Sequence, residues 1–138
     1  MSFVMPPVSH TLVAAILSYE WGIGVRAGCF CAHPGMAYLL GVSPEDMASL
    51  ELQIMQHEKF GVPGATRASL ALYNSADDVD TLVEALQAIA SGHHSGKYIL
   101  DRATNEYMPE GVQLDFDAAF SIADAMGPAS KRRDRVYD

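Results

Sequence analysis

Residues 23–34 gather more reactive side chains than any other stretch of this sequence. The stretch reads IGVRAGCFCAHP, so Cys29, Cys31 and His33 follow one another on alternate positions, shortly after Arg26. A thiolate is a strong nucleophile, and a cation nearby favours the thiolate over the thiol. An accessible cysteine close to Arg26 is therefore the first candidate for a reactive group in this chain.

The residues around the two cysteines predict how they are positioned. Residues 23–27 contain β-branched side chains and predict a strand. Gly28 permits a turn that a residue with a Cβ atom would resist, and Pro34 opposes regular structure beyond it. We therefore expect the thiols to lie on a loop that follows the end of a strand.

Hydrophobic spacing and turn residues predict the other elements. Further strands are expected at residues 2–5 and 66–73, a hairpin at 97–100 and 106–108, and a final helix at 115–126. Three further helices are expected to follow the N-caps Ser9, Ser43 and Ser75 and to end at Gly22, near Lys59 and at Gly92, with a short helical turn at 36–40. This order predicts an α+β fold: a two-layer sandwich whose small, mostly antiparallel sheet has helices packed on one face.

Composition excludes several classes of partner. The chain has 138 residues, enough for one domain, and a formal net charge of −8 that argues against nucleic acid or an acidic membrane. No apolar run is long enough to span a bilayer, and residues 1–22 lack the basic start of a signal peptide. Two cysteines this close together do not form a disulfide framework. We therefore expect a cytoplasmic protein with neither nucleic acid nor membrane as a partner.

Three motifs carry a resemblance to a known family. They are VRAGCFCAHP at 25–34, GATRASLALYN at 64–74 and DDVDTLVEAL at 77–86. The motifs resemble the C-terminal part of class V aminotransferase-type enzymes, which shows an R-x-G-x-x-C-A-x-P segment, an R-A-S-x-x-x-Y-N strand and an acidic-capped helix. Within that family they are most similar to the cysteine desulfurase and selenocysteine lyase branch, which uses pyridoxal phosphate. The resemblance covers residues 2–91.

The resemblance implies roles for three residues, and a fourth, His33, is a candidate from its own chemistry. Cys31 matches the cysteine that attacks the sulfur or selenium of the substrate and becomes a persulfide. Arg67 matches the arginine that binds the substrate carboxylate, for which a planar guanidinium is well suited. Arg26 is expected to support the cysteine loop and favour the thiolate, and His33 to exchange protons with Cys31. The plainer interpretations are a small apolar cysteine, two arginines in surface salt bridges and an ordinary loop histidine.

The resemblance also implies that a second domain is needed. Enzymes of this family hold pyridoxal phosphate on a lysine of a large domain, and the lysines here (Lys59, Lys97 and Lys131) lie in no matching context. We therefore expect residues 1–92 to be the small domain of a fold-type I pyridoxal phosphate enzyme. Residues 93–128 are expected to be an extension packed on it and residues 129–138 a disordered tail.

Several expectations about partners follow. The chain alone is expected to bind no pyridoxal phosphate and to require the large, cofactor-binding domain before it acts on an amino-acid substrate. The surface that would meet that domain favours a homo-oligomer when it is exposed. The chain could be a truncated gene product, an engineered piece or a natural short protein, and the substrate could be cysteine, selenocysteine or a related amino acid.

Two other interpretations remain open. One is a stand-alone, non-enzymatic protein that dimerises or carries sulfane sulfur on Cys31. The other is a metal-binding module built from Cys29, Cys31 and His33, with His93 or His94 as a further ligand. The metal interpretation is the weaker one, because zinc sites usually take a second ligand pair that this sequence lacks.

Overall fold

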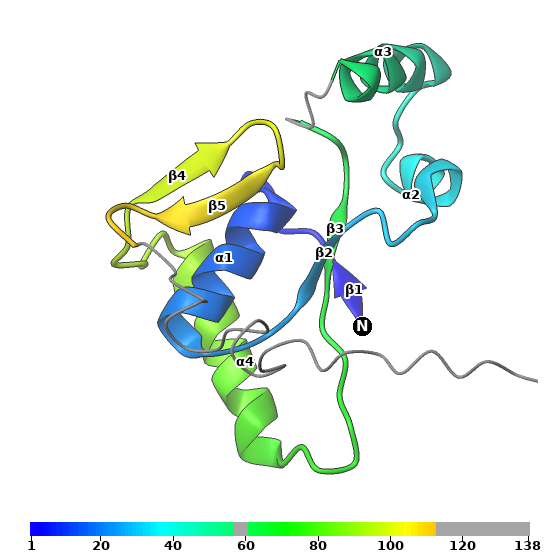
Figure 1. The fold of residues 1–138 in the computed structure, drawn as a ribbon. Helices are drawn as coiled ribbons and strands as arrows, with labels where there is room; N and C mark the ends of the chain where they lie inside the picture. Colours follow the sequence, from blue (N-terminus) through cyan, green and yellow to red (C-terminus); the bar gives the residue numbers. More distant parts are fainter. Residues whose placement is uncertain (57–60, 113–138) are drawn as a thin grey trace, which may run out of the picture.

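A computed structural model describes residues 1–56 and 61–112 and confirms the predicted α+β class (Figure 1). The predicted helix at 115–126 and the tail at 129–138 lie outside the described residues. The elements are β1 (Ser2–Phe3), α1 (His10–Trp21), β2 (Arg26–Gly28), α2 (His33–Leu39), α3 (Pro44–Met55), β3 (Ala65–Arg67), α4 (Ala76–Ala90), β4 (Tyr98–Asp101) and β5 (Glu106–Pro109).

Strands β1, β3 and β2 form an antiparallel sheet in that order, with β3 in the centre. Arg67 of β3 lies opposite Ser2 on one side and opposite Arg26 on the other. Residues directly opposite each other in an antiparallel pair project from the same face of the sheet. Ser2, Arg67 and Arg26 therefore share one face, and we call these three residues the arginine row. Thr66, one position earlier, belongs to the opposite face.

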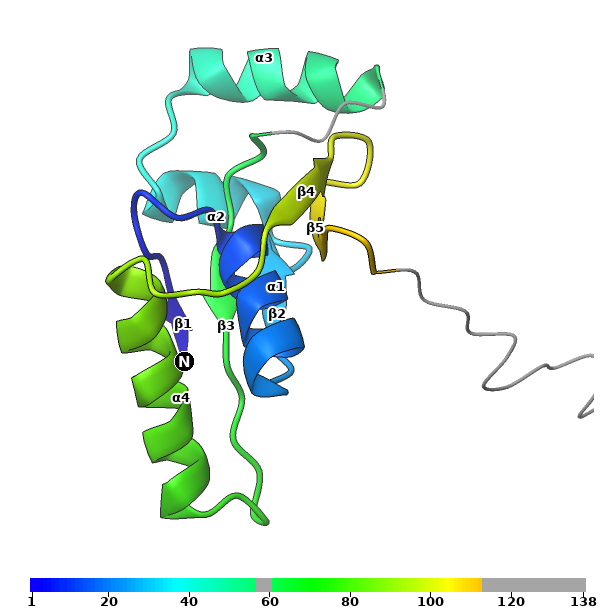
Figure 2. The same ribbon diagram turned by 90° about the vertical axis from the view of Figure 1, so that its left-hand side faces the viewer.

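Helix α1 covers the face of the sheet that carries Thr66. The hydroxyl of Thr66 is buried and donates a hydrogen bond of 3.2 Å to the carbonyl oxygen of His10, at the start of α1. Ile16 and Leu17 of the same helix are completely buried. Helix α4 packs on α1, while α3 lies at the other end of the molecule (Figures 1 and 2). The buried core cluster consists of Val13, Ile16, Leu17, Ala68, Leu82, Ala85 and Ile89.

The helix starts follow the signals in the sequence. Ser9, Ser43 and Ser75 each accept a hydrogen bond from a backbone N–H three residues later, as N-caps do. Asp78 completes the capping box of α4 by accepting from the backbone N–H of Ser75 at 2.8 Å. Helix α1 ends at Gly22, whose φ of 66° is a left-handed conformation that glycine adopts readily.

The predicted hairpin is present as β4 and β5, and it packs on α1. The carboxylate of Glu20 joins the two. It accepts hydrogen bonds from the backbone N–H and hydroxyl of Ser95, from the N–H of Gly96 and from the hydroxyl of Tyr98, at 2.9 to 3.1 Å. These contacts place the described part of residues 93–112 firmly against the rest of the chain.

Three strands are shorter than predicted. The strand expected at 2–5 spans only Ser2–Phe3. The strand expected at 66–73 ends at Arg67. The N–H of Ala68 donates to the carbonyl oxygen of Met1, and the N-terminal amino group of Met1 donates to the carbonyl oxygen of Ala68. Pairing with β1 stops there, and a turn follows. In that turn the side chain of Asn74 accepts from the N–H of Ala71, a local bond that competes with a strand ladder. The strand expected at 23–27 spans only Arg26–Gly28. Residues 23–25 instead form an irregular segment after α1, in which Ile23 and Val25 pack against the core cluster.

Pro34 also has a different role from the one expected. It lies in the first turn of α2, a helix that begins at His33, before the expected short turn. A proline is tolerated there because the first N–H groups of a helix have no partner within the helix.

Candidate functional site

The two cysteines lie on a tight turn directly after β2, as the sequence predicted. The backbone N–H of Ala32 donates to the carbonyl oxygen of Cys29 at 2.9 Å, which closes a four-residue turn. Its two central residues, Phe30 and Cys31, have φ values of 54° and 62°. Left-handed backbone costs an ordinary residue roughly 1–2 kcal/mol, so this turn is strained twice. Cys31 is exposed at its tip.

Two glycines fix the base of the turn. Gly28 has a φ of 118°, and Gly64, just before β3, passes directly against it. A Cβ atom on Gly64 would lie 2.8 Å from the Gly28 backbone and 2.7 Å from Nε2 of His10. Such contacts require displacement of the backbone, so the close approach depends on glycine at position 64.

The turn contacts the arginine row through an aromatic ring. The guanidinium of Arg67 lies 4.9 Å from the ring centroid of Phe30, within the range of a cation–π interaction. This contact ties the residue next to Cys31 to the last residue of β3. Arg67 was expected at the start of its strand, but its position at the end brings it to the cysteine turn.

Arg67 keeps one donor without a partner. Its Nε atom is buried and makes no hydrogen bond to any described residue. Neither Arg67 nor Arg26 forms an ion pair within residues 1–56 and 61–112, so the salt-bridge interpretation of these arginines finds no support there. A buried N–H without an acceptor costs about 1–3 kcal/mol. The described residues therefore supply no anionic partner for the arginines of the arginine row.

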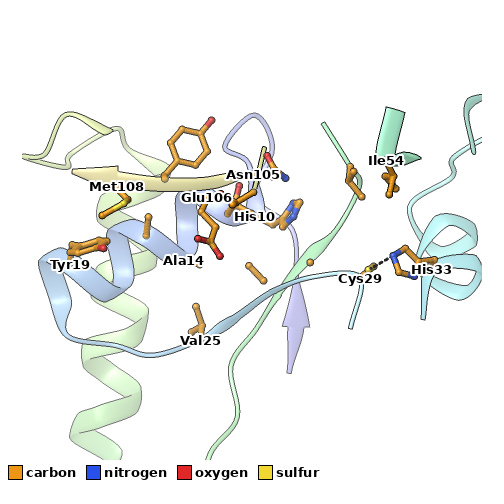
Figure 3. A pocket seen from close by; sticks show the side chains of 17 residues that line it. His10, Ala14, Tyr19, Val25, Cys29, His33, Ile54, Asn105, Glu106 and Met108 are labelled. Atoms are coloured by element: carbon orange, nitrogen blue, oxygen red, sulfur yellow. Dashed lines mark hydrogen bonds between the residues drawn. The ribbon is translucent and has the colours of Figure 1, made fainter. Parts of the chain in front are cut away.

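His33 pairs with Cys29. The Nε2 atom of His33 lies 2.9 Å from Sγ of Cys29, and the two side chains point toward one another (Figure 3). Cys29 is half-buried, whereas Cys31 is exposed. His33 forms its hydrogen bond with Cys29, so proton exchange with Cys31 stays a prediction.

A groove of about 840 Å³ runs from the Cys29–His33 pair along α1 to the hairpin (Figure 3). Burial lowers the pKa of His10, which lines the middle of the groove, so its imidazole is neutral at neutral pH. Polar side chains along the groove include those of His10, Tyr19, Cys29, His33, Asn105 and Glu106. The groove and the arginine row are thus two separate polar features, with the cysteine turn common to both.

Comparison with known proteins identifies the family. The family model described as aminotransferase class-V matches residues 1–82, more than half of the chain. The chain belongs to the class-V aminotransferase family. No solved structure matches it significantly.

Curated relatives of this class-V aminotransferase family member are cysteine desulfurases. A probable cysteine desulfurase of Vibrio cholerae serotype O1 is 36% identical over 86 residues, which are 62% of this chain and 16% of the relative. Cysteine desulfurases of Serratia proteamaculans and Yersinia pestis are each 39% identical over 70 residues, which are 51% of this chain and 12% of the relative. The chain thus spans well under a fifth of the length of these relatives.

The described residues do not fit covalently bound pyridoxal phosphate. Lys97 is the one lysine among them, and it is exposed just before β4 and does not line the groove. Lys59 and Lys131 lie outside the described residues. A metal site finds no support either, since no three His, Cys, Asp or Glu side chains in the described part gather to hold an ion. None of the described helices is long and apolar enough to cross a membrane.

Two contacts of this class-V aminotransferase family member were not anticipated from its sequence. The Cys29–His33 pair has a spacing of four residues, which is a usual signal for contact within a helix but here bridges a turn and the first residue of α2. The Phe30–Arg67 contact joins residues far apart in the chain and has no local signal. Finding it required the register of β2 on β3.

Proposed function

We propose that this chain acts as the small domain of a pyridoxal phosphate-dependent cysteine desulfurase or selenocysteine lyase. In that role Cys31 receives the sulfur or selenium of an amino-acid substrate, and Arg67 binds the substrate carboxylate. Alone, the chain should neither hold the cofactor nor turn over the substrate. Its two free cysteines suit a reducing compartment such as the cytoplasm.

The contact between Phe30 and Arg67 is the observation that carries this proposal. It holds the neighbour of an exposed thiol against a guanidinium whose Nε has no partner among the described residues. A guanidinium binds a carboxylate through two parallel hydrogen bonds. An amino acid held this way on Arg67 would place its side chain close to the cysteine turn.

The other site residues support these two. Arg26 lies directly opposite Arg67 and adds a second positive charge to the same face, which further favours an anionic ligand. Because Cys31 is exposed, the sulfur it receives remains accessible to an acceptor.

An apolar loop supports the need for a larger partner. Between β3 and α4, the side chains of Leu70, Leu72 and Tyr73 are 65%, 107% and 88% exposed. Apolar side chains grouped on one exposed loop are typical of a surface that packs against another domain. The curated relatives are several times longer than this chain, and the additional length could supply that domain, with the lysine that holds pyridoxal phosphate.

A chimera tests the proposal. Residues 1–92 would replace the matching segment of the Vibrio cholerae relative, and release of alanine from cysteine would be measured. We expect activity from the chimera, no alanine from the chain alone, and a loss of at least about a hundredfold on Cys31→Ala, as removal of a nucleophile usually gives. Ala32→Gly is the matched control, since it alters the same turn without touching a thiol.

Two results would overturn the proposal: alanine release by the chain alone, or full activity of the Cys31→Ala chimera. If the chimera does not fold, the isolated chain still tests the carboxylate site. Addition of L-alanine should shift the Nε–H signal of Arg67 in an NMR spectrum, and Arg67→Lys should bind the amino acid about tenfold more weakly because it loses the bidentate geometry. An unshifted signal at saturating alanine would count against Arg67 as the carboxylate ligand.

A further inference from the structure

The cysteine turn places two thiols in different surroundings. Cys31 is exposed, while Cys29 is half-buried at the end of the groove with its Sγ 2.9 Å from Nε2 of His33 (Figure 3). The proposed function uses Cys31 and leaves the Cys29–His33 pair without a role. Enzymes commonly use a thiol beside an imidazole as a nucleophile, and here the thiol also faces a groove.

The pair is suited to make a nucleophile. The imidazole of His33 can take the proton of the Cys29 thiol through Nε2, which leaves a thiolate. His33 is exposed, so the proton can then pass to water. The groove beside Cys29 is large enough for a small acceptor molecule or for the side chain of a partner.

The two cysteines lie close together along the backbone. Cys29 and Cys31 are two residues apart, which limits their Cα separation to about 7 Å even in an extended chain. The turn closed between Cys29 and Ala32 brings them closer than that limit. A persulfide on Cys31 carries its outer sulfur a further ~2 Å from Sγ, which lengthens the reach of that side chain.

We propose that Cys29, with His33 as its base, takes the sulfane sulfur from the Cys31 persulfide and holds it at the groove. The Cys29 thiolate attacks the outer sulfur, a new bond forms between that sulfur and Sγ of Cys29, and the sulfur–sulfur bond on Cys31 breaks. Cys31 leaves as a thiolate, and the proton from Cys29 passes to His33. Cys29 is oxidised to a persulfide and Cys31 is reduced, so the step needs no external oxidant.

This inference rests on the proposed function, because it requires Cys31 to carry a persulfide. As a consequence, uptake of the sulfur and its delivery to an acceptor would take place at different cysteines. Cys31 collects the sulfur beside the arginine row, and Cys29 presents it in the groove, away from the arginines. Cys31 is then free for a second substrate before the first sulfur has left the protein.

A pulse of inorganic polysulfide tests the transfer on the chain as it is, without any cofactor. After a short pulse and desalting, aliquots are alkylated over time, and peptide mass spectrometry locates the sulfane sulfur. We expect the label on Cys31 first and then on Cys29, with the Cys29 fraction rising as the Cys31 fraction falls. His33→Gln should slow this second phase by about tenfold or more, as loss of a general base does. His93→Gln is the matched control and should leave it unchanged.

The outcomes separate the two proposals. Label that stays on Cys31 at all times would overturn the transfer and leave the proposed function intact. Label that reaches Cys29 in Cys31→Ser as fast as in the unaltered chain would also overturn it, since the sulfur would then come directly from polysulfide. A Cys31 that takes no label at all would count against both proposals.

Discussion

The two faces of the three-stranded sheet differ in how far the chain satisfies its own polar groups. On the inner face Thr66 is 1% exposed and donates its hydroxyl to the carbonyl oxygen of His10. One residue later, Arg67 projects from the outer face with a buried Nε that has no partner among the described residues. The inner face thus satisfies its buried hydroxyl within the chain, whereas the outer face keeps a buried donor that no described residue satisfies.

The energetics of the two faces run in opposite directions. The inner face contributes stability because helix α1 packs on it with completely buried side chains such as Ile16 and Leu17. The outer face carries an unpaired N–H, which costs about 1–3 kcal/mol, and two left-handed residues, Phe30 and Cys31, at roughly 1–2 kcal/mol each. Strain of this kind persists where the surrounding structure holds it, and it is concentrated at functional sites.

The largest effect is expected on the inner face. Leu17→Ala should lower the free energy of unfolding by about 2–5 kcal/mol, because it leaves a cavity in the core under α1. Leu72→Ala is the matched control: the same truncation on a side chain that is 107% exposed should change stability by less than about 0.5 kcal/mol. Urea unfolding followed by circular dichroism measures both. Similar losses for the two variants would mean that the exposed loop is also packed.

Arg67→Met should separate stability from binding on the outer face. Removal of the unpaired Nε should stabilise the folded chain by about 1–3 kcal/mol. Loss of the contact with Phe30 should destabilise it by about 0.5–1 kcal/mol, so the free energy of unfolding should rise by roughly 1 kcal/mol. Affinity for L-alanine should fall about tenfold or more, because hydrogen bonds to charged groups contribute about 1.5–3 kcal/mol.

The control for Arg67→Met is Arg26→Met. Arg26 is exposed, so its replacement should shift stability by less than about 0.5 kcal/mol. Urea unfolding and an alanine titration followed by NMR provide the two readouts. A clear loss of stability in Arg67→Met would show that Arg67 has a structural partner and that the outer face is not reserved for a ligand.

The sequence was sufficient for elements that are set by local chemistry. The N-caps Ser9, Ser43 and Ser75 and the glycine at position 22 marked helix ends because each acts on backbone groups within a few residues. The hairpin was predictable for the same reason. Strand lengths were not, because the end of β3 depends on where its neighbours stop pairing, and Asn74 favours a turn instead.

The candidate site was predictable as a set of residue types but not as an arrangement. The family motifs pointed to Cys31 and Arg67, and the structure places Phe30, the neighbour of Cys31, on the guanidinium of Arg67. That contact depends on the register of β2 and β3 and on two left-handed residues that no local propensity favours. The Cys29–His33 pair was missed because the turn between them was expected to be irregular.

The hydrogen bonds that join Glu20 of α1 to the hairpin give a smaller, pH-dependent test. Burial raises the pKa of its carboxyl, but the hydrogen bonds from Ser95, Tyr98 and Gly96 together outweigh burial, so the pKa lies below its ordinary value of 4.5. A carboxyl with a lowered folded-state pKa contributes stability that is fully present above the ordinary value and is lost as the pH falls through the folded value. Glu20→Gln should therefore cost about 1–2 kcal/mol at neutral pH and progressively less as the pH falls below that ordinary value.

The control for Glu20 is Glu84→Gln on the exposed side of α4. Urea unfolding at a series of pH values should give a difference from the unaltered chain that shrinks in acid for Glu20→Gln and stays near zero for Glu84→Gln. A difference for Glu20→Gln that grows in acid would reverse the sign of the linkage and refute a lowered pKa.

The smallest effect is expected from Cys31→Gly, and its sign is what matters. Glycine removes a left-handed penalty of roughly 1–2 kcal/mol but gains about 0.5–1 kcal/mol of entropy in the unfolded chain, so the free energy of unfolding should rise by about 0.5–1 kcal/mol. Cys31→Ala removes the thiol and keeps the Cβ atom, so its stability should match that of the unaltered chain. A gain in the glycine variant alone would mean that the outer face holds an exposed thiol in a strained turn at the expense of stability. Equal stability of all three would mean that the turn relaxes, and that the two faces of the sheet differ less than their contacts indicate.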